Sequence, residues 1–376
     1  IDRDLVQKVI RYSVRMIDNT VDINYYPTED SKASNMKHRP IGLGIRGYHD
    51  AMYGMGILFD TNEAVDFADE SMELISYYTI LSSSELAREK GRYQSYEGSK
   101  WSRGILPQDT IELLEKERNT VIDIPKGGKL DWTPVRNHIK EFGMRNSNTM
   151  AIAPTASTAN LVGCIPTVEP IYKNIYVKSN KEGEFIVVNK YLVEDLKKLN
   201  LWNRDMVNKI KFFDGSIQDI HEIPQEIKNK HKEVFDIDQK WLILAAARRG
   251  KWIDQAQSIN IFFKGTSGKD LSDIYMMAYD LGLKTTYYLR TLGASQVEKS
   301  TVNSSEFGST HLRGGKASIV QSSTAIHDIP SSFNQVPSAV PVSVAVPEVA
   351  QALNIEKPKY VIYRPEQVEE CEGCSA

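Results

Sequence analysis

The segment DLSDIYMMAYDLGLKTTYYLR (residues 270–290) contains the pattern that decides the fold class. Residues 270–281 predict a helix, and Gly282 is placed to end it because glycine readily adopts the left-handed conformation that follows many helices. LKTTYYLR (283–290) follows with the β-branched and aromatic residues that favour a strand. A helix that leads directly into a strand is typical of α/β proteins.

Earlier parts of the chain alternate in the same way. HRPIGLGIRGYHDAM (38–52) combines small and apolar residues and predicts a buried strand. A long amphipathic helix is expected from Thr61, a good N-cap, to Lys90, with Gly91 ending it. MRNSNTMAIAP (144–154) predicts a further strand end. Strands that alternate with helices favour a parallel α/β sheet or barrel.

The remaining pattern is mostly helical. PTASTANLVG (154–163) predicts a turn and a short helix, and the segment near Glu182-Gly183 predicts a hairpin. Residues 92–137 are expected to be rich in loops because glycine and proline recur there. Other helices are expected at residues 1–24, 191–200, 204–211 and 238–249.

Composition narrows the class of partner. The net charge of -3 gives no general attraction to nucleic acid or to anionic membranes, so we expect small molecules or proteins as partners. The chain contains no stretch of ~20 apolar residues and does not open like a signal peptide. These features predict a cytoplasmic protein that binds neither nucleic acid nor membrane.

The character of the chain changes after Gly293. Residues 294–370 are rich in Ser, Thr, Val, Gln and Pro without helical periodicity, and we expect a flexible, low-complexity tail. The tail leads to a separate terminus, residues 371–376. Residues 1–293 are therefore expected to form the folded domain.

Two of the three cysteines lie in that terminus, in the sequence Cys371-Glu-Gly-Cys374. Two thiols at this spacing can form a disulfide and exchange with another one. Metal binding and an inert tail are the alternatives, although two thiols cannot complete a four-ligand zinc site. Because a zinc site would need further ligands, we favour redox exchange over metal binding.

A second candidate site is Pro154-Thr155-Ala156-Ser157-Thr158. Hydroxyl groups and unpaired backbone N–H groups at the start of a helix can bind an anion such as a diphosphate. The same sequence is also an ordinary helix cap, which is the more frequent use of such residues.

The third candidate is the pair Tyr287-Tyr288. Neighbouring residues of a strand point to opposite faces, which would place one ring in the core and the other on the surface. If the backbone bends so that the rings meet, two phenols offer successive positions for a hole and its proton. Cys164, in LVGCIP, is expected to be a small buried apolar residue, and the seven histidines show no metal-binding spacing.

Together these blocks resemble the large subunit of class I ribonucleotide reductases. The resemblance rests on eight ordered blocks between residues 22 and 291 and on the terminal CEGC. The blocks are DINYYP (22–27), KHRPIGLGIRG (37–47), ELAREKGRYQSYEGS (85–99), GIL (104–106), GMRNS (143–147), APTASTANLVG (153–163), IDQAQSINIF (253–262), GLKTTYYLRT (282–291) and CEGC (371–374).

The resemblance implies a role for each candidate site. Pro154, Thr155, Ala156, Ser157 and Thr158 would bind the diphosphate of a ribonucleoside diphosphate. Tyr287 and Tyr288 would pass on a radical supplied by a metal-containing small subunit. Cys371 and Cys374 would reduce the active-site disulfide and be reloaded by thioredoxin or glutaredoxin. No metal or other cofactor is expected to bind directly to this chain.

The sequence also departs from the family. The radical cysteine, both cysteines of the substrate-reducing disulfide and the allosteric region have no counterpart here. The resemblance therefore implies the C-terminal half of a ten-stranded α/β barrel, completed by an N-terminal part of the large subunit on another polypeptide. It implies reduction of ribonucleotides to deoxyribonucleotides for DNA synthesis, only within that complex.

Two other functions stay open at this point. A cobalamin-dependent reductase would make its radical beside the substrate, and the adjacent tyrosines argue against it because such an enzyme needs no long relay. A non-catalytic remnant that only binds the other subunits is the second alternative. The intact PTAST, Tyr-Tyr and CxxC elements argue against loss of function.

Overall fold

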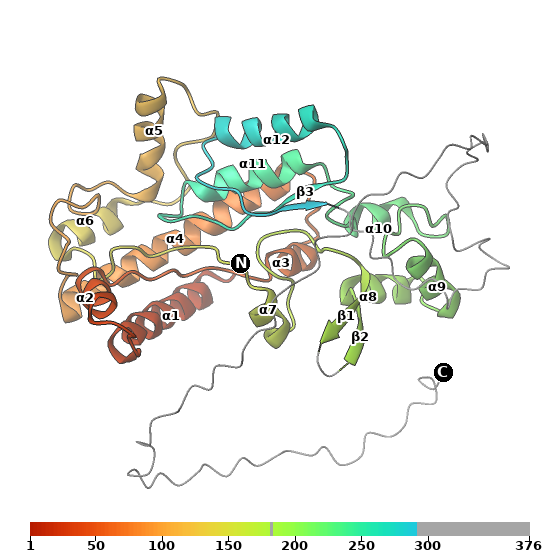
Figure 1. The fold of residues 1–376 in the computed structure, drawn as a ribbon, viewed down its shortest axis with the longest axis horizontal. Coiled ribbons are helices and arrows are strands. Elements are labelled where there is room, and N and C mark those ends of the chain that lie inside the picture. Colours follow the sequence, from red (N-terminus) through yellow and green to blue (C-terminus); the bar gives the residue numbers. More distant parts are fainter. Residues whose placement is uncertain (181–182, 292–376) are drawn as a thin grey trace, which may run out of the picture. The chain divides into compact units, whose positions relative to one another are not determined.

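The computed structural model describes residues 1–180 and 183–291, and Figure 1 shows their arrangement. The described residues form twelve α-helices, one short 3-10 helix and four short strands. In chain order the elements are α1 (Arg3–Ile23), α2 (Glu29–His38), α3 (Tyr48–Met55), α4 (Asn62–Lys90), η1 (Pro107–Asp109), α5 (Thr110–Arg118), α6 (Thr133–Phe142), α7 (Ala156–Val162), β1 (Ile175–Asn180), β2 (Gly183–Val188), α8 (Lys190–Lys198), α9 (Arg204–Phe212), α10 (Gln225–Lys230), α11 (Gln239–Gly250), β3 (Ile261–Phe263), α12 (Gly268–Asp280) and β4 (Leu289–Thr291).

The long helix α4 begins and ends where the sequence predicts. The hydroxyl of Thr61 accepts a hydrogen bond from the backbone N–H of Ala64, which satisfies one of the free donors of the first turn. Gly91 ends the helix with a positive φ of 88°, a backbone angle that residues with a side chain rarely adopt. The expected helices at 1–24, 191–200, 204–211, 238–249 and 270–281 are confirmed as α1, α8, α9, α11 and α12.

Four chain segments run parallel to one another and form the frame of the fold. Bridges pair Leu43 with Met150 and Ile152 with Gln257, and β3 pairs with β4, all in parallel orientation. The segments are therefore ordered 41–44, 149–152, 255–263 and 287–291, and main-chain hydrogen bonds join each to the next. The α/β class predicted from the sequence is confirmed in this arrangement.

Helices connect these segments and pack against one another. Figure 1 shows α11 lying between α4 and α12, and α11 contacts both of these helices. The core shared by α4 and α11 includes Trp252, which is fully buried and stacks on Trp132 with ring centroids 5.6 Å apart. Burial of each large apolar side chain contributes roughly 1.5–3 kcal/mol. The helix layer thereby fixes the position of the parallel segments.

Two sequence predictions need correction. Residues 48–52, expected in a strand, form the start of α3, and only the segment around Leu43 makes bridging hydrogen bonds. Residues 92–137, expected to be loop-rich, also contain η1, α5 and the start of α6. In residues 92–137, Pro107 and Pro134 occupy the first turns of helices, where the missing N–H of proline costs nothing. These prolines therefore indicate where helices begin and do not indicate loops.

The predicted strand at 283–290 is shorter than expected. Regular pairing in β4 starts only at Leu289. The hairpin is confirmed: β1 and β2 pair antiparallel from Ile175 opposite Val188 to Asn180 opposite Gly183. Helices α8 and α9 pack beside the hairpin around a separate apolar cluster that includes Leu192, Met206 and Ile210.

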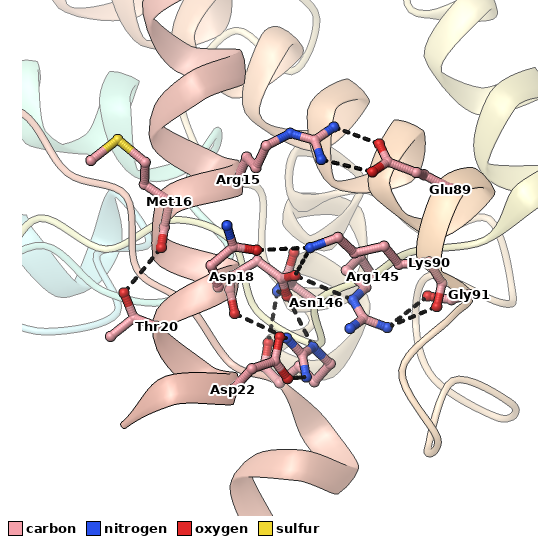
Figure 2. A network of polar contacts seen from close by, with 12 residues as sticks. Arg15, Met16, Asp18, Thr20, Asp22, Glu89, Lys90, Gly91, Arg145 and Asn146 are labelled. Atoms are coloured by element: carbon pink, nitrogen blue, oxygen red, sulfur yellow. Dashed lines mark hydrogen bonds and ion pairs between the residues drawn. The ribbon is translucent and has the colours of Figure 1, made fainter. Parts of the chain in front are cut away.

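A buried polar network joins α1 to the rest of the fold (Figure 2). The carboxylate of Asp18, fully buried, accepts hydrogen bonds from Arg39 Nε at 2.9 Å and from Asn146 Nδ2 at 3.0 Å. Arg145 Nε lies 3.3 Å from its second oxygen. A buried carboxylate is tolerated only when several donors satisfy it, so this network fixes α1 against the segments that carry Arg39 and Asn146.

The helices of the described residues include none that combines the length and the apolar character needed to cross a membrane.

Candidate active site

A cavity of about 820 Å³ borders the third and fourth parallel segments and the stretch that follows the carboxyl end of the second, and we call it the carboxyl-end cavity. Ligands of α/β proteins bind preferentially at the carboxyl ends of parallel strands. The cavity is lined by Asp50, Pro154, Thr155, Asn160, residues 163–167, residues 169–173, Tyr176, residues 187–191, Asn260, Phe262, Tyr287, Tyr288 and Arg290.

The two tyrosines line this cavity together. Their ring centroids lie 3.9 Å apart with the planes tilted by 42°, and the side chains are 43% and 52% exposed. The expectation that Tyr287 and Tyr288 point to opposite faces is therefore wrong. Hydrogen bonding with the Tyr288 phenol raises the pKa of Tyr287 above its usual value, and desolvation acts in the same direction.

A bulge in the backbone explains why the rings meet. The N–H of Tyr287 donates to the carbonyl of Ile259 at 2.8 Å, and the next inter-strand bond runs from the N–H of Ile261 to the carbonyl of Tyr288 at 2.9 Å. Two residues of one segment thus face Asn260 alone. An extra residue in one strand breaks the alternation of side chains and re-aims them.

Asn260 and Glu169 complete the hydrogen bonding at the bulge. The N–H of Tyr288 donates to Asn260 Oδ1 at 3.3 Å. The backbone N–H of Asn260 donates to Glu169 Oε1 at 2.7 Å, and its side-chain Nδ2 donates to Glu169 Oε2 at 3.0 Å. Glu169 is only 8% exposed, and desolvation raises the pKa of its carboxyl despite these donors.

The PTAST segment reaches the same cavity with its first two residues. Pro154 and Thr155 line it, and α7 begins at the next residue, Ala156. Thr155 is the N-cap residue of α7 but makes no side-chain capping bond; its hydroxyl instead accepts the N–H of Thr167 at 2.8 Å. The first-turn N–H groups of a helix have no partner within it.

Among the described residues that line the cavity, Arg290 is the cation without an ion pair, and its charge opposes the rise in the pKa of Glu169 that burial causes. Lys173 pairs with Asp214, and Lys190 lies 3.7 Å from Asp50. Arg290 makes no ion pair with any residue that the structure describes, and its guanidinium carbon lies 5.4 Å from the centre of the Tyr288 ring. Arg290 can therefore pair with an anion that enters the cavity.

The cysteines fall into two groups. Cys164 is partly buried and lines the carboxyl-end cavity, so it is less buried than the small buried apolar residue that the sequence predicts. Cys371 and Cys374, like the expected tail at 294–370, lie outside the described residues. Within 1–180 and 183–291, no group of three or more His, Cys, Asp or Glu side chains could hold a metal ion.

Sequence reasoning missed Glu169 and Asn260. Glu169 lies in VEPIY (168–172), which matches no motif, and Asn260 lies in IDQAQSINIF, which the resemblance covers without assigning a role. The signal for Asn260 was a polar residue next to the apolar strand Ile261–Phe263, because an amide removed from water needs hydrogen-bond partners.

Comparison with known proteins agrees with this geometry. Residues 1–289 match the family described as "Ribonucleotide reductase, barrel domain". The chain is 46% identical over 311 residues to the ribonucleoside-diphosphate reductase subunit alpha of Chlamydia pneumoniae, covering 82% of this chain and 30% of that protein. It is 39% identical over 296 residues to the large chain of the Schizosaccharomyces pombe reductase, covering 78% and 35%.

A solved structure shows the same architecture. The class Id ribonucleotide reductase alpha subunit of Actinobacillus ureae superposes with a TM-score of 0.59 at 26% identity, covering 78% of this chain and 47% of that one. The chain spans about a third of the length of the relatives from Chlamydia and fission yeast, 30% and 35%. With a family match over nearly all of its described residues, the chain belongs to the ribonucleotide reductase barrel-domain family.

Proposed function

We propose that the chain is the C-terminal part of the catalytic subunit of a ribonucleoside-diphosphate reductase. It would form half of a ten-stranded α/β barrel and act in the reduction of ribonucleotides to deoxyribonucleotides by a radical mechanism. The observation that carries this proposal is that Pro154, Thr155, Tyr287 and Tyr288 line one cavity. Removal of a ribose hydroxyl requires an anchor for the charged end of the nucleotide and a source of oxidising equivalents, and these residues offer both.

The anchor would be the PTAST segment, residues 154–158. Pro154 and Thr155 border the cavity, and the start of α7 presents N–H groups that have no partner within the helix, together with the positive end of the helix dipole. Arg290, free of ion pairs among the described residues, adds a permanent positive charge on the same cavity. A ribonucleoside diphosphate has the charge that fits this combination.

The radical route would run through Tyr287 and Tyr288. A metal-containing small subunit would supply the radical, and the two rings at 3.9 Å would pass it toward the reacting ribose. The hydrogen bond between the two phenols, which raises the pKa of Tyr287, supports this use because it joins the two rings directly. Cobalamin chemistry needs no such pair, so the geometry favours the small-subunit route.

The reducing electrons would come through the terminal cysteines. Cys371 and Cys374 would exchange with an active-site disulfide and would be reduced in turn by thioredoxin or glutaredoxin. We assign residues 1–293 to the barrel portion, 294–370 to a flexible tail and 371–376 to the redox terminus. The setting of such exchange is a reducing one, which agrees with a cytoplasmic protein.

The N-terminal part of the large subunit would complete the barrel. The relatives are about three times as long as the matched region, so a large partner segment is available. The outer face of α1 carries apolar side chains at the spacing of a helix-packing seam, all more than half exposed. They are Leu5, Val9, Tyr12, Met16 and Ile23. We assign the N-terminal part as the occupant of this seam.

The test is reconstitution. The chain would be mixed with an N-terminal part of a relative's large subunit and with a small subunit, and conversion of CDP to dCDP would be measured with thioredoxin as reductant. Activity is expected only in the complete mixture. Turnover by the purified chain alone, or none in the mixture although the parts co-purify, would contradict the proposal; the second result would point to a non-catalytic role.

A further inference from the structure

The bulge at Tyr287 and Tyr288 depends on one short chain of hydrogen bonds, which we call the Glu169–Asn260 link. In it the carboxylate of Glu169 accepts two N–H groups of Asn260, and Asn260 Oδ1 accepts the N–H of Tyr288. Glu169 and Asn260 are 91 residues apart in the chain, and both line the carboxyl-end cavity. The link therefore connects a separate segment to the tyrosine pair.

The bulge makes this link necessary. Because Tyr287 donates to Ile259 and Tyr288 accepts from Ile261, the N–H of Tyr288 has no main-chain acceptor opposite it. Asn260 Oδ1 fills that position from the side chain. Without an acceptor there, the segment would gain by sliding into regular pairing, which would return the two rings to opposite faces.

Glu169 decides which way the amide of Asn260 points. An ionised carboxylate only accepts hydrogen bonds, so the amide must turn its NH₂ group toward Glu169. The amide oxygen then faces Tyr288, as observed at 3.3 Å. A flipped amide would place a donor against the N–H of Tyr288 and an oxygen against the carboxylate. Glu169 thus acts on the tyrosines through Asn260.

We propose that Glu169 and Asn260 are positioning residues that hold Tyr287 and Tyr288 in the bulged geometry required for radical transfer. The inference deepens the proposed function and rests on it for the role of the tyrosines. Neither residue exchanges electrons or protons with the substrate. Their contribution is the distance and tilt between two phenol rings.

Turnover by the reconstituted reductase tests the role. Asn260→Leu and Glu169→Gln are each expected to lower kcat by about 100-fold with KM for CDP unchanged, since a misplacement of about 1 Å can cost that much. In Glu169→Gln the new NH₂ group opposes that of Asn260. Adding Asn260→Asp restores a donor–acceptor match and should recover most of kcat. Glu194→Gln, an exposed carboxylate on α8, is the matched control.

A measurement on the purified chain tests the geometry without any turnover. Tyr287 would be replaced with 3-fluorotyrosine and its ¹⁹F resonance followed from pH 6 to pH 11. In Asn260→Leu and Glu169→Gln the pKa of this phenol should fall toward its free value, and the double change Glu169→Gln with Asn260→Asp should raise it again. An unchanged titration in both variants, or a double variant no better than Glu169→Gln, would overturn the proposal. If reconstitution fails while the pKa of the Tyr287 phenol changes as expected in the variants, the proposed function is contradicted but the positioning role is not.

Discussion

The rings of Tyr287 and Tyr288 lie 3.9 Å apart and line one cavity, although the two residues are neighbours on an extended segment. A bulge opposite Asn260 produces this arrangement, because it breaks the alternation that would otherwise separate the rings. The predictions below begin with this pair.

Removal of either phenol hydroxyl should stop turnover. Tyr287→Phe and Tyr288→Phe keep the ring and its packing but cannot be oxidised at neutral pH by the same route. In the reconstituted reductase each variant is expected to lose more than ~100-fold in kcat. Equilibrium binding of CDP, measured by calorimetry, should stay within about twofold of wild type. Normal rates in either variant would exclude a relay through that tyrosine.

Thr155→Val should weaken substrate binding. The hydroxyl of Thr155 borders the cavity and accepts the N–H of Thr167, so valine removes a polar group from the anchor and leaves that N–H without its acceptor. Hydrogen bonds to charged groups contribute about 1.5–3 kcal/mol, which corresponds to a roughly tenfold to 100-fold rise in the dissociation constant of CDP. Thr133→Val, at an exposed position of α6, is the control and should bind normally. If Thr155→Val and Thr133→Val bind CDP with equal affinity, Thr155 does not anchor the substrate.

The terminal cysteines should be needed for turnover with thioredoxin but not for turnover with a small dithiol. Cys371→Ser combined with Cys374→Ser is expected to block multiple turnovers driven by thioredoxin, because the shuttle to the active site is lost. Turnover driven by a small dithiol, which reaches the active site by diffusion, should continue at a similar rate. Both rates would be measured on the same preparation. Equal loss with the two reductants would indicate a structural role.

Asp18→Asn should destabilise the fold strongly. Asp18 is fully buried and faces Arg39, Arg145 and Asn146, so the neutral amide leaves the buried Arg39 and the partly buried Arg145 underpaired. Loss of one partner of a buried ion network costs about 3–5 kcal/mol. Urea unfolding would measure this change. Glu89→Gln breaks the exposed pair with Arg15 at the same helix interface and should cost far less than Asp18→Asn, because solvent screens exposed charges; comparable losses would contradict the assignment.

Mild acid should reveal the burial of His49. Burial, with His231 nearby, lowers the pKa of His49 from 6.5 to about 3, so the folded state binds this proton less readily than the unfolded state. Its contribution to stability is present above pH 6.5 and is lost as the pH falls below it. Between pH 7.5 and 5.5, wild type should lose about 1.3 kcal/mol relative to His49→Gln. A difference that does not change with pH would argue against a neutral buried imidazole.

The sequence by itself predicted much of the local structure and located the three candidate motifs. Helices such as α4 follow from residues that act within one turn, for example Thr61 at its start and Gly91 at its end. The Pro154–Thr158 and Tyr287–Tyr288 motifs are contiguous, so they could be found from the order of residues alone. Proline was misread before α5 and α6 because the same residue begins helices and interrupts them.

Only the tertiary structure decided which of these residues meet. Pairing between the 255–263 and 287–291 segments creates the bulge, and that pairing depends on packing of helices far away in the sequence. The same packing brings Glu169 to Asn260 across 91 residues and leaves Arg290 beside the tyrosines. Hydrogen-bond register and burial are properties of contacts between distant segments, and no local pattern encodes them.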